Sequence, residues 1–368
     1  MSFTIRQTAA SLPHPTMAPP ATLVYQRPST KRIAMRYGAT ILDAEGLRLS
    51  AEEKAFFAQA NPFGFILFAR NIDSAEQTRA LCNDLREAVG RDCLITVDQE
   101  GGRVQRLRPP LARQWQPALD HASVAGAGAT RAMYLRARLI ADELRDLGID
   151  SNCAPLADVA GEGTHPFLKN RCYGTDLTTV VTRARATAEG LLDGGVVPVV
   201  KHIPGHGRAS MDSHHDLPRI TASLADLARE DFAAFAALND LPMGMTAHLV
   251  YETLDSEPAT LSPRVMQMIR SDIGFDGLIM SDDISMKALN GAPADIARDT
   301  IAAGCDVVLF CNAPLDDRAA VAEAAGEMTD AAQARAERAE AARRTPAALD
   351  IPTAEAELSA LMGGQVYG

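Results

Sequence analysis

From Tyr37 onward, short apolar runs bounded by turn residues alternate with stretches of helical spacing. The apolar runs cover residues 39–46, 63–71, 93–102, 149–159, 196–205, 242–251, 277–283 and 305–312. Between them, helical spacing is clearest at 74–89, 131–147, 178–193, 221–238 and 293–303. Alternation of strands and helices indicates a parallel sheet covered by helices. Eight such units predict an α/β protein that folds as a single (β/α)8 barrel of the TIM type.

A doubly wound sheet is the alternative, but the dinucleotide and P-loop glycine motifs are both absent. The Ala-rich segment 316–345 is expected to form one or two C-terminal helices that cover the barrel. Residues 1–36 are rich in Pro, Ser, Thr and Ala and have no apolar period, which predicts a disordered tail. Translation from Met17 or Met35 is another interpretation of this segment. The barrel domain is therefore expected to span residues 37–368.

Composition excludes several classes of protein. The formal net charge of −11 and the lack of a basic stripe argue against nucleic-acid binding. No apolar run approaches the roughly 20 residues of a membrane helix, and the N-terminal segment lacks the apolar core of a secretory signal. The six cysteines show no CxxC spacing. We therefore expect a reduced, cytoplasmic protein without a membrane association.

Polar residues stand at the end of every predicted strand, where barrel enzymes place their chemistry. They are Asp43, Arg70, Asp98, Asp158, Lys201, His202, His248, Asp282 and Asn312. A single polar residue at a strand end is more often a cap or a loop ligand than a catalyst. So many in register predict one polar pocket.

Four motifs narrow the chemistry: "VDQEGGRVQRL" (97–107), "NRCYG" (170–174), "KHIPGHG" (201–207) and "SDDISM" (281–286). Each has an ordinary structural interpretation: the glycine pair as a tight turn, Arg171 as a surface ion pair, and Asp282 or Asp283 as a helix cap. The histidine-rich stretch 201–218 adds "DSHHDLP" directly after "KHIPGHG". Together the motifs point to a pocket with a carboxylate and several hydrogen-bond donors.

In order and spacing, these motifs resemble glycoside hydrolase family 3, and within it the bacterial single-domain β-N-acetylglucosaminidases. The resemblance begins near Gly38, includes "ILFARN", "NCAPLADV" and "TAHLVY", and fades after about residue 315. Cys172 and Ile203 depart from the usual residues of the pattern, and neither touches the implied chemistry.

The resemblance implies a role for each matching residue. A retaining glycosidase uses a carboxylate nucleophile and a separate proton donor, and Asp282 matches the nucleophile. Asp212 and His214 match a His–Asp pair that serves as the acid and base in this type of enzyme. The matching substrate-binding residues, which would hold the terminal sugar through its hydroxyls, are Asp98, Arg106, Arg171, Lys201 and His202.

The resemblance also implies the substrate. Enzymes of this type remove N-acetylglucosamine from 1,6-anhydro-N-acetylmuramic acid, with or without peptide, during bacterial cell-wall recycling. The expected partner is thus a muropeptide or another N-acetylglucosaminide, and we expect no cofactor and no metal. A monomer or a weak oligomer is expected. The sequence leaves open the preference for peptide-bearing substrates.

Three alternatives remain at this level. A metal-dependent, amidohydrolase-like enzyme could use His202, His206 and neighbouring acids, but Pro204, Gly205 and Gly207 oppose the helix that would align the two histidines. His206 is therefore expected to shape the loop, and His215 to be a solvated neighbour. A non-enzymatic sugar sensor would not require a nucleophile and a proton donor together. A histidine donor also leaves less negative charge near the glycosyl-enzyme, so phosphorolysis by inorganic phosphate is a further alternative.

Overall fold

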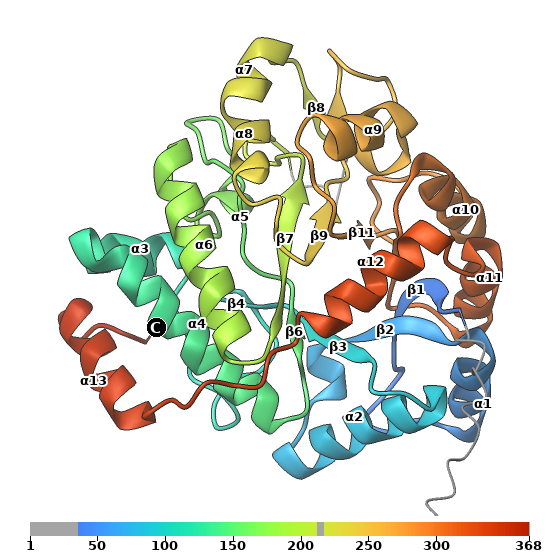
Figure 1. Ribbon diagram of the computed structural model, residues 1–368, viewed down its shortest axis with the longest axis horizontal. Coiled ribbons are helices and arrows are strands. Elements are labelled where there is room, and N and C mark those ends of the chain that lie inside the picture. Colours follow the sequence, from blue (N-terminus) through green and yellow to red (C-terminus); the bar gives the residue numbers. More distant parts are fainter. Residues whose placement is uncertain (1–35, 212–216, 368) are drawn as a thin grey trace, which may run out of the picture. The chain divides into compact units, whose positions relative to one another are not determined.

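The computed structural model describes residues 36–211 and 217–367. Its main sheet contains eight parallel strands in the order β3-β2-β1-β12-β11-β9-β7-β6 (Figure 1). The strands are β1 (Gly38–Asp43), β2 (Pro62–Leu67), β3 (Leu94–Val97), β6 (Ser151–Asn152), β7 (Val197–Ile203), β9 (Met243–Thr246), β11 (Leu278–Asp283) and β12 (Val307–Phe310). Backbone hydrogen bonds from Asp150 N to Ile95 O and from Cys153 N to Val97 O connect β6 to β3. The sheet therefore closes on itself, and the predicted (β/α)8 barrel is confirmed.

Helices surround the sheet (Figure 1). They are α1 (Ala51–Ala60), α2 (Ala75–Val89), α3 (Ala118–Ala125), α4 (Ala129–Asp146), α5 (Pro166–Lys169), α6 (Leu177–Asp193), α7 (Leu224–Arg229), α8 (Asp231–Ala236), α9 (Pro263–Ser271), α10 (Pro293–Ala303), α11 (Leu315–Ala325), α12 (Asp330–Ala341) and α13 (Ile351–Leu361). Local sequence sets their ends: Ser74 caps the first turn of α2, and Gly90 ends that helix with a φ of 66°. Two short sheets of the described residues lie outside the barrel: β4 (Gln99–Gly101) with β5 (Val104–Gln105), and β8 (Arg219–Ile220) with β10 (Val250–Tyr251).

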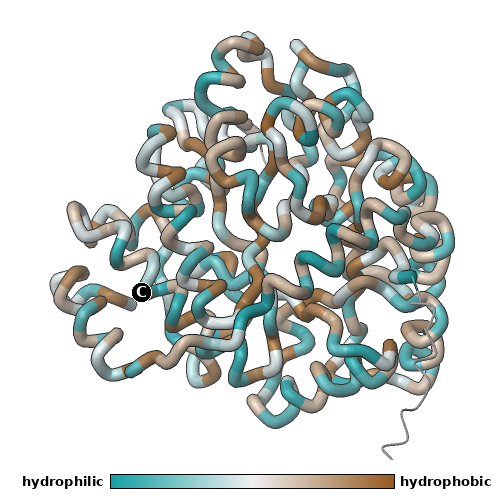
Figure 2. The backbone as a smooth tube through the Cα atoms, in the orientation of Figure 1, coloured by the Kyte–Doolittle hydropathy of each residue, from teal (hydrophilic) through white to brown (hydrophobic). Residues whose placement is uncertain are grey.

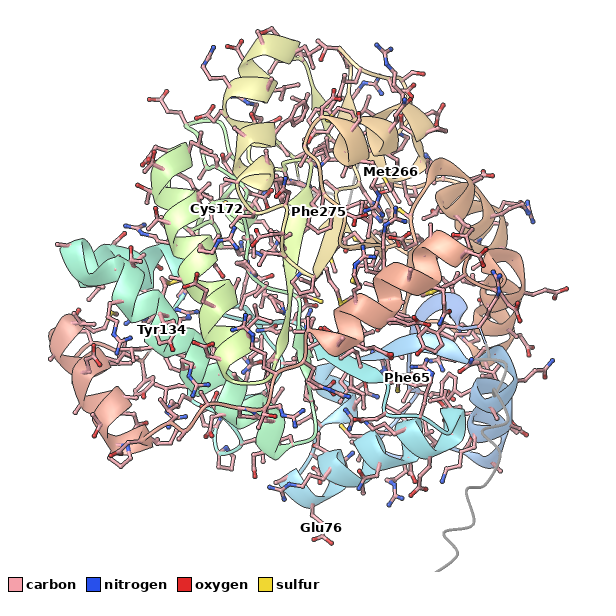
Figure 3. All side chains as sticks on the ribbon, viewed as in Figure 1. Phe65, Glu76, Tyr134, Cys172, Met266 and Phe275 are labelled. Carbon is pink, nitrogen blue, oxygen red and sulfur yellow. The ribbon has the colours of Figure 1, made fainter. Side chains whose placement is uncertain are left out.

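Apolar side chains of the strands and of the inner helix faces form the core. The outer helices alternate between polar and apolar residues, as Figure 2 shows, and α2 buries Leu81, Cys82, Leu85 and Val89 on one face. In Figure 3, Phe65 and Phe275 lie among the central side chains, whereas Glu76 projects outward from α2. The core therefore fills the barrel and the layer beneath the helices.

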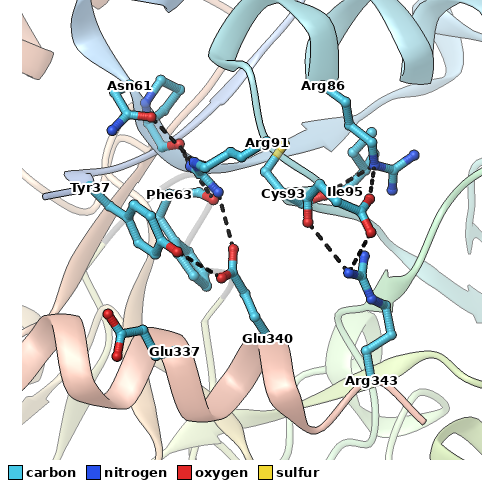
Figure 4. A network of polar contacts seen from close by, with 12 residues as sticks. Tyr37, Asn61, Phe63, Arg86, Arg91, Cys93, Ile95, Glu337, Glu340 and Arg343 are labelled. Carbon is cyan, nitrogen blue, oxygen red and sulfur yellow. Dashed lines mark hydrogen bonds and ion pairs between the residues drawn. The ribbon is translucent and has the colours of Figure 1, made fainter. Parts of the chain in front are cut away.

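Two of the C-terminal helices, α11 and α12, match the covering helices predicted within 316–345. At the end of α12, Glu340 accepts hydrogen bonds from the Tyr37 hydroxyl (2.9 Å) and from Arg91 (3.1 Å) (Figure 4). Arg343 and Arg86 both bind the buried carboxylate of Asp150. This network ties the last part of the chain to β2 and β3. A third helix, α13, packs against α4 and was not predicted.

Candidate active site

A cavity of about 450 Å³ opens at the carboxyl ends of the barrel strands. The six described residues that were predicted as catalytic or sugar-binding all line it: Asp98, Arg106, Arg171, Lys201, His202 and Asp282. They come from β7, β11, the β3–β5 region and the loop after α5. Parallel strands end at the same rim of the barrel, so residues far apart in sequence meet there.

Asp98 and Glu100 hold the basic side chains on one wall of this cavity. Asp98 binds Arg106 and Lys201, with both N–O distances at 2.9 Å. Glu100 receives two hydrogen bonds from Arg171 (2.9 and 2.8 Å) and lies 2.7 Å from Lys201 Nζ. Lys201 thus bridges the two carboxylates.

The protonation states of this cluster follow from the pairing. Burial alone would raise the pKa of Glu100, but Arg171 and Lys201 lower it to about 2. Burial also opposes the charge of Asp98, yet Lys201 and Arg106 hold the pKa of that carboxyl well below its usual value. Burial works against the charged amine of Lys201, and Asp98 and Glu100 nevertheless raise its pKa. Every member of the cluster is therefore charged at neutral pH, which leaves a rigid array of charged hydrogen-bonding groups.

Glu100 was not among the predicted site residues, although its side chain is only 3% exposed and pairs with two of them. A signal for it exists in the sequence. In an extended segment, residues two apart point to the same side, and Glu100 follows Asp98 by two within "VDQEGG".

His202 is oriented by a carboxylate behind it. Its Nδ1 lies 2.8 Å from Asp158 Oδ2, and the His206 backbone N–H donates to Asp158 Oδ1 at 2.7 Å. His202 itself lines the cavity, and the contact with Asp158 uses only Nδ1 of its two ring nitrogens. His206 also lines the cavity, and burial lowers its pKa to about 4, so its ring is neutral at neutral pH. The loop-shaping role predicted for His206 therefore describes its backbone but not its ring.

Asp282 lies at the end of β11 on the cavity. Burial would raise its pKa, but His248, His202, the Asp283 N–H and Lys201 together lower it. Asp283 differs sharply: burial raises its pKa to about 7, although Ser285 N–H donates to it. Two adjacent aspartates thus have separate environments, and Asp282 is the more fully ionised of the two at neutral pH.

Four of the predicted strand-end residues do not line the cavity. Asp43 is fully buried and binds Arg70, Arg318 and the Asn312 N–H, and Arg70 also donates to Asn312 Oδ1. Asp158 supports His202 from behind, as described above. His248 lies between the Thr260 hydroxyl (2.8 Å) and the Asp283 carbonyl (3.1 Å). These side chains support the rim instead of facing the cavity. Asp212 and His214, the predicted acid–base pair, and His215 lie outside the described residues.

The glycine pair in "VDQEGG" faces the protein itself. Gly101 has a φ of 106°, and a Cβ at this position would come within 2.0 Å of Arg136 Nη2. A Cβ on Gly102 would meet Pro117 at 2.9 Å. The structural interpretation of the pair as a tight turn therefore fits: the two glycines allow the β4–β5 hairpin to pack on the segment 115–117 and on Arg136.

Over residues 36–211 and 217–367, no three His, Cys, Asp or Glu side chains converge on a common metal position. None of the described helices combines the length and apolarity needed to cross a membrane.

Comparison with known proteins identifies the family to which the chain belongs. The family model for the glycosyl hydrolase family 3 N terminal domain matches residues 32–344. A beta-hexosaminidase of Bordetella avium is 38% identical over 289 residues, covering 75% of this chain and 81% of that protein. A beta-hexosaminidase of Methylococcus capsulatus is 39% identical over 279 residues, covering 74% and 83%.

Solved structures agree with the sequence relatives. NagZ from Neisseria gonorrhoeae, in a complex with a zinc ion, superposes with a TM-score of 0.79 at 29% identity, covering 89% of this chain and 99% of that one. The barrel, the polar cavity at its rim and these relatives all lead to the same assignment. The chain belongs to glycosyl hydrolase family 3, and it is a glycoside hydrolase of the β-N-acetylhexosaminidase type.

Proposed function

We propose that the protein is a retaining β-N-acetylglucosaminidase in which Asp282 attacks the anomeric carbon of a terminal N-acetylglucosamine. The observation that carries the proposal is the ionised Asp282 on a cavity whose wall presents the charged Asp98–Lys201–Glu100–Arg171 array. A retaining glycosidase needs an ionised carboxylate at the attacking position. Asp283 is a poorer candidate because its pKa is raised to about 7, so a large share of this carboxyl is protonated at neutral pH.

Sugar binding is assigned to Asp98, Arg106, Arg171, Lys201 and His202. Each lines the cavity. The four basic residues are each fixed by an ion pair or hydrogen bond to Asp98, Glu100 or Asp158, and Asp98 is fixed by Arg106 and Lys201. Charged groups that are already positioned bind sugar hydroxyls without paying a large ordering cost. Asp98 accepts hydrogen bonds in this scheme, and the four basic residues supply donors.

Asp212 and His214 complete the proposed mechanism as the acid–base pair. His214 would protonate the departing oxygen and then activate water, while Asp212 orients its ring. The support for this pair is its match to the family pattern in "DSHHDLP".

The proposed natural substrate is N-acetylglucosaminyl-1,6-anhydro-N-acetylmuramic acid, with or without peptide, in the recycling of peptidoglycan. The relatives named beta-hexosaminidase and the NagZ structure support the sugar class. A cytoplasmic location is part of the proposal, because all six cysteines are free and buried, as in a reducing compartment. We also propose that the protein acts as a monomer or weak oligomer.

The test uses a fluorinated N-acetylglucosamine analogue that forms a slowly hydrolysed glycosyl-enzyme. Mass spectrometry of the digested protein should find the sugar on Asp282, and Asp282→Asn should lose hydrolysis by several orders of magnitude while still binding sugar. An adduct on Asp283, or a product of inverted configuration, would overturn the assignment. Repeating the assay with phosphate decides between free sugar and sugar 1-phosphate as the product.

A further inference from the structure

We propose that His206 is a further sugar-binding residue, and that its ring nitrogen Nε2 forms a hydrogen bond with one hydroxyl of the N-acetylglucosamine. This proposal rests on the proposed function and deepens it, because it adds a residue that distinguishes between sugars in the same cavity. The loop-shaping role predicted for His206 concerns its backbone and leaves the function of its ring unexplained.

The His206 ring lies in the wall of the cavity without a hydrogen bond to the surrounding protein. The residue is only 6% exposed, and it lines the cavity. Its Nδ1 is fully buried and has no hydrogen-bond partner. Within residues 36–211 and 217–367, Nε2 has no partner either, and this nitrogen is not fully buried. Nε2 is therefore the ring nitrogen that a ligand in the cavity can reach.

A second histidine shows that the position of the ring matters as much as its missing partners. His121 is fully buried, and both of its ring nitrogens lack a hydrogen-bond partner among the described residues. His121 does not line the cavity. Because buried polar groups are nearly always hydrogen-bonded, each of these histidines is unusual. Only His206 combines the missing partner with access to a cavity in which a ligand supplies one.

The backbone of His206 is fixed before any ligand binds. Its N–H donates to Asp158 Oδ1 at 2.7 Å, and the other oxygen of this carboxylate lies 2.8 Å from Nδ1 of His202. The next residue is in close contact with a neighbouring segment, since a Cβ on Gly207 would lie 1.9 Å from the Val159 carbonyl oxygen. The two histidine rings lie 5.5 Å apart, centre to centre. A side chain that is already positioned loses little conformational entropy when it binds a sugar.

The chemistry of the ring suits a hydroxyl. Burial and the neighbouring His202 lower the pKa of His206 to about 4, although Asp158 and Asp282 act in the opposite direction. The ring is therefore uncharged at neutral pH, and Nε2 donates or accepts one hydrogen bond according to the tautomer. A sugar hydroxyl both donates and accepts, so it matches either tautomer. Because the charge of Asp282 acts on His206, this hydroxyl belongs to the sugar whose anomeric carbon lies at Asp282.

The test combines variants of His206 with sugars that each lack one hydroxyl. The substrates are 4-nitrophenyl N-acetyl-β-glucosaminide and its 3-deoxy, 4-deoxy and 6-deoxy analogues. His206→Leu keeps an apolar side chain of similar size without the hydrogen bond. We expect its kcat/KM for the complete sugar to fall about threefold to tenfold, mainly through KM. For the deoxy sugar that lacks the partner hydroxyl, wild type and His206→Leu should be nearly equal, whereas the loss should persist for the other two.

Two further variants separate the hydrogen bond from packing. His206→Gln places an amide near the position of Nε2 and should restore part of the lost kcat/KM. His121→Leu is the matched control, because His121 is also buried and without a partner but does not line the cavity. It should leave KM unchanged for all four glycosides, and thermal unfolding of each variant reports on the fold.

The same fold-loss on all four glycosides in His206→Leu would overturn the proposal, since it would show that the ring only packs against His202. An unchanged KM in that variant would overturn it as well. If His206→Leu did not fold, His206→Asn, whose shorter amide ends before the position of Nε2, would carry the same comparison. If the wild type cleaved none of the glycosides, the proposed function would fail. Calorimetric titration of N-acetylglucosamine and its three deoxy analogues would then still decide whether His206 binds a hydroxyl.

Discussion

His214 and Asp282 divide the proposed chemistry, and replacing them should have different consequences. His214→Ala should lower turnover of a natural disaccharide by about 10²–10⁴, the usual contribution of a general acid. An aryl glycoside with an acidic phenol needs little protonation, so formation of its glycosyl-enzyme should suffer far less. The intermediate should then accumulate, and azide should speed turnover because it needs no base. Steady-state and pre-steady-state kinetics on the two substrates measure both effects.

His202 provides the control for this experiment, because its imidazole is held by Asp158 on the sugar-binding side of the cavity. His202→Ala should damage both substrates to a similar extent. Leaving-group dependence at His202, with His214→Ala near wild type, would contradict the assignment and move the acid–base role to His202.

Glu100 should matter for stability as well as for sugar binding. Glu100→Gln leaves Arg171 and Lys201 in a buried site with one carboxylate fewer, so we expect a loss of about 3 kcal/mol in the free energy of unfolding. Urea denaturation measures it. Glu357→Gln removes a comparable pair with Arg131 on the surface and should cost less than about 1 kcal/mol. Equal losses in the two variants would show that the buried Glu100 pairs stabilise the protein no more than a surface ion pair does.

The same carboxylate gives the stability a defined pH dependence. The pKa of Glu100 is lowered from 4.5 to about 2 in the folded protein. A lowered pKa means that the folded state favours the ionised form, so its stabilising effect is complete above pH 4.5 and is lost as the pH falls toward 2. In Glu100→Gln, this part of the acid-side loss should be missing from urea denaturation measured across that range.

At the scale of elements, α13 supports the hairpin that carries the sugar-binding wall. The helix packs on α4, and Tyr367 contacts Trp115 with ring centres 5.4 Å apart. Trp115 lies beside Arg136, and Arg136 donates hydrogen bonds to the carbonyls of Glu100 and Gln116. The C-terminal segment thus contacts the hairpin that carries Glu100 through Trp115 and Arg136.

Deletion of residues 346–368 should therefore affect both stability and binding. We expect a melting temperature lower by about 5 °C or more, because buried Leu358 and Ala354 are lost from the interface with α4. KM for an N-acetylglucosaminide should rise more than kcat falls. Differential scanning calorimetry and steady-state kinetics test this, and Tyr367→Ala should reproduce part of the effect. A deletion variant with wild-type KM would show that the hairpin does not need this support.

The strands and the long helices could be predicted because their apolar periods are strong, as in β7 and α2. The helix α13 was not predicted because it buries only Ala354 and Leu358, and alanine contributes little to an apolar helical period. The β4–β5 hairpin was not predicted either, for another reason. It is short, and Gln99 and Gln105 fix it by donating to the Leu107 carbonyl, a tertiary arrangement with no periodic signature.

The candidate site, like the fold, could be predicted from the sequence only in part. Asp98, Lys201 and Asp282 were predicted to share a pocket because the ends of parallel strands converge. The sequence could not separate residues that face the cavity from those that support its rim. Asp43 is directed away from the cavity only because Arg318, 275 positions later by sequence number, reaches it together with Arg70.

For the whole molecule, the prediction concerns the N-terminal segment. A protein that starts at Met35 keeps Arg36 and Tyr37, whose side chains bind the Met328 carbonyl and Glu340. The composition of the segment before Met35 predicts little contribution to the barrel. Melting temperature and turnover should therefore stay close to those of the full chain. A large loss of either would show that the segment packs on the barrel or closes over the cavity.

Closure of the barrel also has a consequence for synthesis on the ribosome. One edge of β1 pairs with β2 soon after it is made, whereas its other edge waits for β12, where Thr40 is opposite Val308. Through most of translation the nascent chain therefore exposes an unpaired strand edge, the kind of surface on which chains associate. Folding to the native state has to wait for contacts of very large sequence separation, which slows it. Chaperones that shield this edge until residue 310 has emerged would favour correct folding over aggregation.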